Sequence, residues 1–308
     1  MFKGVKKRII IYGLVLLFIL TACVFSVFYF ANVKSALAMP FYDLQPQNLV
    51  LRAQFSTSYA SSIDERKNNI LIASKSLDNI LIAPNEEFSF NKTVGERTEK
   101  RGYKNAKIII NGEFVDGIGG GVCQVSTTLY NAVLLAGLKI IEYHPHSLAV
   151  SYVAPSFDAM VNSGSADLRF INNTHNPVIL SCVANGEFLS VKVYGQPMKE
   201  KYVRKSVILG EIPAPEYEVV TDALGEYPDL FEGESKIIKY SKAGLKSEGY
   251  LCCVINGKVT NTKRIRVDTY SAVRGKIVKG AVPRVEQPLI DSLNPLCFSL
   301  KSKKVIIF

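Results

Sequence analysis

The sequence lacks the cysteine patterns that build disulfide frameworks and zinc sites. Six cysteines are spread over 308 residues. That is too few for a disulfide framework in a chain of this length, and no two of them form a Cys-x-x-Cys pair. Cys252 and Cys253 are neighbours in the sequence. Because a bridge between adjacent residues is strained, we expect both to be small strand residues.

The sequence also has no nucleic-acid-binding motif, so no nucleic-acid partner is expected. The formal net charge is +10 at pH 7, but four of the basic residues, Lys3, Lys6, Lys7 and Arg8, precede the first apolar run. The remaining charge is scattered, which is typical of a solvated surface. A modestly basic surface suits an anionic cell envelope or a membrane face.

One apolar run, Ile9 to Ala31, is long enough to span a bilayer. Basic residues precede it, so we expect a cytoplasmic N-terminus and a membrane-anchored protein whose bulk is extracytoplasmic. Two alternatives stay open. Ser35-Ala-Leu-Ala38 resembles a signal-peptide cleavage site, and Leu20-Thr-Ala-Cys23 resembles a lipobox. The length of the run favours the anchor, because signal-peptide apolar regions are shorter and apolar residues continue past Cys23 to Phe30.

Hydrophobic residues make up 48% of the chain, which is ample for a core and predicts one or two domains. Amphipathic periodicity predicts a helix at 62–77 and a buried helix that ends at Gly137. Asn-Gly pairs at 111–112, 185–186 and 256–257 predict three β-hairpins. Helices and hairpins alternate without a regular βαβ run, so the predicted class is α+β: a helix-plus-hairpin core followed by a small all-β module.

The predicted organisation has six segments. They are a cytoplasmic tail at 1–8, a transmembrane helix at 9–31, a linker at 32–60, the core domain at 61–200, the β-rich module at 201–284 and a tail at 285–308.

The stretch from Gly117 to Gly137 holds the strongest chemical signal. Four glycines in five residues lead directly into Cys123, which the apolar pattern places in the first turn of the buried helix. Unpaired backbone N–H groups and the helix dipole favour an anion there, and a thiolate is such an anion. Two of the three histidines, His144 and His146, follow shortly afterwards. The alternative is an inert buried cysteine, beneath a loop that only lets the helix pack closely.

Several motifs together resemble the VanW family. They are Asn85-Glu-Glu-Phe-Ser-Phe-Asn91, Gly95-Glu-Arg-Thr98, Arg101-Gly-Tyr103, Gly117-Ile-Gly-Gly-Gly-Val-Cys-Gln-Val-Ser-Thr-Thr-Leu-Tyr-Asn131, His144-Pro-His-Ser147 and Ser165-Ala-Asp-Leu168. The resemblance covers roughly residues 62 to 196. It implies a membrane-anchored bacterial envelope protein, in a family named from an accessory gene of vancomycin-resistance clusters. Residues 201–284 resemble, more weakly, a G5 module, an extended β-unit linked to cell-wall sugar binding.

The first interpretation of the site is a Cys–His enzyme. Cys123 is the candidate nucleophile. His144 or His146 is the candidate base. Asp158 or Asp167 is the candidate carboxylate that orients the imidazole. The order of cysteine at a helix start, strand histidine and then aspartate is similar to transglutaminase- and papain-like folds.

This interpretation also predicts how the reaction is supported. The backbone N–H of Cys123 and the side chain of Gln124 are candidate oxyanion donors. The substrate would be a peptide or amide bond in the envelope, with peptidoglycan stem peptides as the local source. The reaction would be acyl transfer or hydrolysis, and no cofactor is expected.

The second interpretation is a non-catalytic binding module. The glycine loop and the helix N-terminus would hold a carboxylate or phosphate, and the β-rich module would grip the cell wall. The candidate binding residues are Gly119, Gly120, Gly121, Arg101, Tyr103 and Ser126. A variant places zinc on Cys123, His144 and His146, which are plausible ligand types. A His-x-His step alone is a weak signal, so no metal is predicted.

Overall fold

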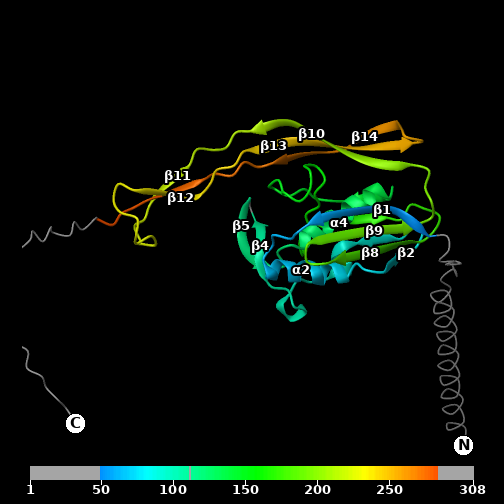
Figure 1. The fold of residues 1–308 in the computed structure, drawn as a ribbon, viewed down its shortest axis with the longest axis horizontal. Helices are drawn as coiled ribbons and strands as arrows, with labels where there is room; N and C mark the ends of the chain where they lie inside the picture. The colour runs from blue at the N-terminus through cyan, green and yellow to red at the C-terminus, as the bar shows by residue number, and fades with distance from the viewer. Residues whose placement is uncertain (1–48, 111, 284–308) are drawn as a thin grey trace, which may run out of the picture. The chain divides into compact units, whose positions relative to one another are not determined.

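The computed structural model describes residues 49–110 and 112–283 (Figure 1). The predicted cytoplasmic tail, membrane span and C-terminal tail lie outside these residues. Within the described part of the chain, no helix is long and apolar enough to cross a membrane. Contacts divide the chain into two compact units. Among the described residues, the first comprises those up to Gly210 together with Lys246–Tyr270, and the second comprises Glu211–Leu245 together with those from Ser271 to Pro283.

A four-stranded antiparallel sheet of order β1-β9-β8-β2 lies at the centre of the first unit. Its strands are β1 (Val50–Ser58), β2 (Ile80–Ile82), β8 (Val178–Ala184) and β9 (Phe188–Gly195). Alternate residues of β9, Leu189, Val191 and Val193, are fully buried, because successive side chains of a strand point to opposite faces. Two helices pack on this sheet and contact each other: α2 (Asp64–Lys75) lies against β8, and α4 (Val122–Leu135) lies against β1 and β9.

Smaller elements complete the first unit. A three-stranded sheet of order β3-β7-β6 contains β3 (Glu87–Ser89), β6 (Lys139–Glu142) and β7 (Arg169–Ile171). The hairpin of β4 (Asn105–Ile110) and β5 (Glu113–Ile118) precedes the glycine loop, and the short helices α3 (Phe90–Val94) and η2 (Glu99–Arg101) lie before it in the chain. A second three-stranded sheet, of order β10-β13-β14, contains β10 (Lys201–Ile212), β13 (Gly244–Ile255) and β14 (Lys258–Tyr270).

The second unit is a small three-stranded sheet of order β11-β15-β12. Its strands are β11 (Glu218–Thr221), β12 (Ser235–Lys239) and β15 (Lys276–Lys279). The central strand β15 pairs in parallel with β11 and antiparallel with β12. Its residue Val278 is buried.

The helix α4 is buried along nearly its whole length. Of the residues from Val122 to Leu134, all are buried except Cys123. More of the helix surface is therefore buried than the one face that the amphipathic pattern predicts. Its polar side chains are accommodated because they are hydrogen bonded. Asn131 Nδ2, for example, donates to the backbone oxygen of Phe157 at 2.7 Å. Gly137 follows the helix with a φ of +73°, as expected for a left-handed residue at a helix C-terminus.

The predicted α+β class is wrong. The structure is mostly β-sheet, with 45% strand and 15% helix, and the expected helix-plus-hairpin core of transglutaminase- or papain-like type is not its architecture. The three Asn-Gly hairpins do form. The strands that were missed lack a strong local signal: residues 50–58, assigned to the linker, form β1 with polar side chains at alternate positions. Their pairing partner β9 lies about 130 residues further along the chain, where no local pattern indicates it.

The domain boundaries inferred from the sequence stay a prediction. The structure adds one observation about the predicted boundary at residue 200: it shows to which unit the residues that follow the boundary belong. Residues 201–210 and 246–270, assigned to the β-rich module, group with the first unit by their contacts. This grouping brings β14 to the site described next.

Candidate functional site

The glycine loop positions Cys123 at the start of α4. Gly119 and Gly121 have φ values of +87° and +108°, a backbone region that glycine adopts without steric cost, and Gly121 is the N-cap of α4. A Cβ atom on Gly120 would lie 2.7 Å from backbone atoms of β4, so a side chain there requires the strand to shift. Cys123 therefore lies in the first helical turn, where backbone N–H groups have no intrahelical acceptor.

The thiol of Cys123 contacts the irregular segment between β6 and β7. Its Sγ–H donates to the backbone oxygen of Val161 at 3.3 Å, and His146 acts on the thiol by lowering its pKa. Both partners belong to this segment, which has no helix or strand. Hydrogen bonds from α4, including that of Asn131, hold the same segment against the helix.

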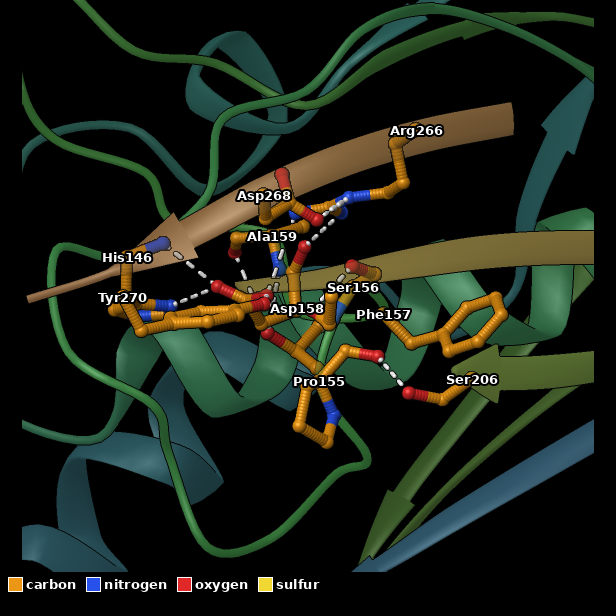
Figure 2. Close-up of polar contacts among 12 residues, drawn as sticks. His146, Pro155, Ser156, Phe157, Asp158, Ala159, Ser206, Arg266, Asp268 and Tyr270 are labelled. Carbon is orange, nitrogen blue, oxygen red and sulfur yellow. Dashed lines mark hydrogen bonds and ion pairs between the residues drawn. The ribbon is translucent and has the colours of Figure 1, made fainter. Parts of the chain in front are cut away.

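His146 is oriented by Asp158 (Figure 2). Its Nδ1 lies 2.7 Å from Asp158 Oδ2, and its backbone N–H donates to the same oxygen at 2.6 Å. Both side chains are buried, 5% and 1% exposed. Because Nδ1 faces Asp158, Nε2 is the ring nitrogen left to face Cys123. The structure thus brings together Cys123, His146 and Asp158 as a chain of thiol, imidazole and carboxylate.

Asp158 is held in turn by β14, as Figure 2 shows. Tyr270 Oη donates to Asp158 Oδ1 at 2.5 Å, and Arg266 Nη2 lies 3.3 Å from the same oxygen. Arg266 Nη1 also donates to the backbone oxygen of Asp158 at 2.6 Å, and its Nε donates to Asp268 at 2.6 Å. The Arg266 guanidinium lies 4.6 Å from the centroid of the Tyr143 ring. Both carboxylate oxygens of Asp158 are therefore occupied by donors.

The electrostatics of the site favour a thiolate beside an imidazolium. Burial by itself would lower the pKa of His146, but its hydrogen bonds to Asp158 and Cys123 raise that pKa to about 9. Burial by itself would raise the pKa of the Cys123 thiol, but the hydrogen bond and charge of His146 outweigh it and hold this pKa below its usual value. Arg97 adds a smaller effect in the same direction. His146 is therefore protonated at pH 7, as in activated cysteine nucleophiles.

The sequence left a choice between two histidines and between two aspartates. The other histidine, His144, and the other aspartate, Asp167, lie elsewhere. His144 Nε2 is 3.0 Å from Glu142 Oε1, and Asp167 accepts hydrogen bonds from Ser89 Oγ at 2.6 Å and from two backbone N–H groups. Neither is brought to Cys123. The zinc variant required His144 beside Cys123. The described residues contain no group of three His, Cys, Asp or Glu side chains that could hold a metal ion.

Gln124 and Ser126 are engaged in hydrogen bonds that support the fold. Gln124 Oε1 accepts from Arg66 at 2.8 Å, and its Nε2 donates to two oxygen atoms of β1. Both amide hydrogens are thus in use and neither is left for an oxyanion. Ser126 Oγ donates to the backbone oxygen of Ala159 at 2.6 Å. The backbone N–H of Cys123 remains the candidate oxyanion donor.

Arg101 and Tyr103, two of the predicted binding residues, differ in their surroundings. Arg101 Nη1 donates to the backbone oxygens of Val94 and Glu96 at 2.7 and 2.6 Å, so it shapes the loop after α3. Tyr103 is 1% exposed, and its hydroxyl has no hydrogen-bond partner among the residues that the structure describes. A buried hydroxyl without a hydrogen-bond partner lowers the free energy of unfolding. The Tyr103 hydroxyl is such a group.

A cavity of about 570 Å³ lies among loop residues of the first unit, and Asn91, Arg97, Glu142 and Asp167 are among the residues that line it. Arg97 Nη2 donates to Asn91 Oδ1 at 2.6 Å. Cys123 is not among the lining residues, but Arg97 is close enough for its charge to lower the pKa of the Cys123 thiol. Arg97 therefore connects the cavity to the thiol.

The residues on β14 were missed by the sequence analysis. Arg266, Asp268 and Tyr270 are buried at alternate positions, and this i, i+2, i+4 pattern of polar and aromatic residues on one strand face is a signal that could have been used. It would not have identified Asp158, which lies more than 100 residues earlier, as the target.

Two residues closer to the thiol were also given no role. Arg97 lies inside a motif quoted for the family resemblance, and Tyr152 lies in the irregular segment. Burial raises the pKa of the Tyr152 hydroxyl, and the charge of Cys123 adds to that effect. Nothing in the local sequence indicates this effect of Cys123 on Tyr152.

Comparison with known proteins identifies the domain that holds the site. A family model described as "VanW like protein" matches residues 65–194. The chain is 42% identical over 152 residues to the uncharacterized protein YoaR of Bacillus subtilis (strain 168), covering 49% of this chain and 50% of YoaR. It is 32% identical over 112 residues to the vancomycin B-type resistance protein VanW of Enterococcus faecalis (strain ATCC 700802 / V583), covering 34% of this chain and 40% of that protein. The chain thus spans at most about half the length of these relatives.

Two solved structures are similar to part of the chain. The G5 domain of HP0197 is 24% identical and covers 27% of this chain and 100% of its own, with a TM-score of 0.15. The G5 domain of an IgA1 protease is 20% identical and covers 29% and 99%, with a TM-score of 0.18. At these TM-scores the likeness says nothing about function. The family motifs, the match over residues 65–194 and the two relatives together show that this chain carries a VanW-like domain.

Proposed function

We propose that the VanW-like domain is a thiol-dependent acyl transferase or amidase. Cys123 is the nucleophile, His146 the acid and base, and Asp158 the carboxylate that orients the imidazole. The observation that supports this most directly is the buried His146–Asp158 pair, joined at 2.7 Å, whose imidazole holds the pKa of the Cys123 thiol below its usual value. A cysteine that only fills space needs neither a protonatable partner nor a buried carboxylate behind that partner, whereas an activated nucleophile uses both.

The reaction follows from the protonation states at the site. The Cys123 thiolate attacks the carbonyl carbon of an amide, and the backbone N–H of Cys123 stabilises the negative oxygen that forms. The C–N bond then breaks, and His146 Nε2 gives its proton to the leaving amine. The product is a thioester on Sγ. Water or a second amine attacks this thioester, His146 takes the proton of that nucleophile, and the carboxylate or the new amide leaves as the thiol is restored.

We further propose that the domain acts on the outer side of the cytoplasmic membrane, with residues 9–31 as its anchor. The basic flank and apolar length of that segment support this location, and one relative bears the name of a vancomycin resistance protein. Peptidoglycan stem peptides are then the amides within reach. Protease added to intact cells should digest the domain, and complete protection would contradict the proposed location.

The catalytic proposal is tested with the purified full chain and peptidoglycan stem peptides. We expect the intact protein to gain the mass of an acyl group on Cys123, and the peptides to yield cleaved or transferred products. The Cys123→Ser variant should lose both signals, whereas Cys182→Ser should keep both, because Cys182 lies in β8 and burial raises the pKa of its thiol to about 12. Unchanged peptides, with no adduct on Cys123, would overturn the proposal for this substrate class.

Binding to the cell wall without catalysis is the second candidate function. The specific observation in its favour is that Cys123 does not line the cavity and that its thiol is hydrogen bonded to Val161, as in a structural cysteine. In this case the full chain should sediment with purified cell walls, and Cys123→Ser should sediment equally well. Sedimentation that depends on Cys123, or none at all, would count against it.

A further inference from the structure

Arg97 is a partly buried cation whose direct hydrogen-bond partners among the described residues are neutral. Its guanidinium donates to the neutral side chains of Asn91, at 2.6 Å, and Ser163, at 3.4 Å. Among the described residues, none of its nitrogen atoms lies within 4.0 Å of a carboxylate oxygen. Charged groups removed from water are generally paired. An arginine in this setting, on the wall of a cavity, has the character of a binding group for an anion.

The carboxylates around the same cavity are largely committed to other partners. Glu142 bonds to His144 and Arg169, and the oxygens of Asp167 accept from Ser89 and from backbone N–H groups. Arg169 is likewise paired, with Glu142 and with Glu87. Arg97 is therefore the lining cation that these groups leave available to a ligand.

The hydroxyl of Tyr103 is a second buried polar group with an unused donor. It is buried and has no hydrogen-bond partner within the described residues. Burial raises the pKa of Tyr103, while the charges of Arg101 and Arg97 lower it. An anion bound by Arg97 would offer the acceptor that the Tyr103 O–H lacks.

Arg97 also lies close to the glycine loop that leads to Cys123. A Cβ atom placed on Gly119 would lie 3.1 Å from the Cβ of Arg97, and Gly119 precedes Cys123 by four residues. We infer that the cavity binds the carboxylate of a carboxylate-bearing acyl substrate, that Arg97 is the residue that holds it, and that the reacting carbonyl is thereby placed at Cys123. This assignment rests on the proposed function and names its substrate class.

The inference is tested with two small reagents that differ in charge. Iodoacetate carries a carboxylate, and iodoacetamide is its neutral counterpart. In both reactions the thiolate forms an S–C bond and iodide leaves. Alkylation of Cys123 in the folded full chain is followed for each reagent by peptide mass spectrometry. We expect the ratio of the iodoacetate rate to the iodoacetamide rate to fall about tenfold in Arg97→Gln, the effect of losing one charge-assisted hydrogen bond.

The ratio separates binding from activation of the thiol. Loss of Arg97 also changes the charge near Cys123, but this alters the thiolate population for both reagents equally and cancels in the ratio. Glu96→Gln is the matched control, because it removes a negative charge from the lining of the same cavity and should leave the ratio unchanged or raise it. Should Arg97→Gln fail to fold, protection of the wild-type thiol from iodoacetamide by acetate, but not by acetamide, gives the same answer.

The outcomes distinguish this inference from the proposed function. Fast iodoacetamide labelling with an unchanged ratio in Arg97→Gln, or equal protection by acetate and acetamide, would refute the carboxylate site and leave the nucleophile intact. A Cys123 inert to both reagents in the folded chain would refute the nucleophile and, with it, the substrate class.

Discussion

Iodoacetamide should alkylate Cys123 of the folded chain at pH 7 much faster than it alkylates Cys182. The thiolate is the reactive form, and the pKa of Cys123 is held below its usual value by His146, whereas burial raises the pKa of Cys182 to about 12. Replacement of His146 by Gln removes the interactions that lower the pKa of Cys123. Burial of the thiol is then the dominant effect, and it raises this pKa. An unperturbed thiol is only about 3% ionised at pH 7, and a buried one is ionised less, so we expect the Cys123 rate in His146→Gln to fall by roughly tenfold or more.

The pH dependence has a defined sign. The Cys123 rate should fall as the pH drops through its lowered pKa, with a midpoint below the ordinary value of about 8.5. His146, with a pKa of about 9, stays protonated across neutral pH. In His146→Gln the midpoint should move above the ordinary value.

His144→Gln is the matched control for this experiment. His144 is two residues from His146 but bonds to Glu142 instead, so its loss should leave the Cys123 rate and midpoint nearly unchanged. Peptide-level mass spectrometry follows each cysteine separately. An equal loss of rate in both variants, or a Cys123 that reacts only after the protein unfolds, would show that the cysteine is structural.

Arg266→Met should cost about 3–5 kcal/mol in the free energy of unfolding, the effect expected when one partner of a buried ion pair is removed. The Arg266 guanidinium is 1% exposed and lies between Asp158 and Asp268. Its loss leaves Asp268 buried without this cation, and leaves Asp158 with His146 but without the guanidinium. Tyr270→Phe should cost less, about 1–3 kcal/mol, because it removes a hydrogen bond to Asp158 and the acceptor for the Ser156 N–H. Urea unfolding of the full chain measures both.

These two residues are positioning residues, and a second measurement separates that role from stability alone. If they hold Asp158 and thereby orient His146, both variants should change the pH midpoint of Cys123 alkylation under conditions where the protein remains folded. Arg264→Met is the matched control on the same strand. Arg264 is largely exposed, pairs with Glu248, and should change unfolding and alkylation little. Variants that lose stability but keep the wild-type alkylation profile would show that β14 only supports the fold.

The sequence by itself determined the local parts of this protein. The glycine loop, the helix that begins beside Cys123 and the Asn-Gly hairpins follow from residues within one turn of helix or one hairpin, where backbone preference and short-range hydrogen bonds decide the structure. The motifs that resemble the VanW family are also contiguous stretches, and the comparisons confirm them. Two members of the site, Cys123 and the His144–His146 pair, could be named for the same reason.

Tertiary structure decided the rest. His144 and His146 lie in a segment without regular structure, so no periodicity indicates which imidazole points toward Cys123. Asp158 becomes the partner because Arg266 and Tyr270, more than 100 residues later, stabilise its charge in a buried position. The β-rich class was decided in the same way: β1 is a polar, alternating segment that becomes a strand because β9 pairs with it. Pairings between distant strands depend on shape and burial that form only when the whole domain folds, and no local window of sequence contains them.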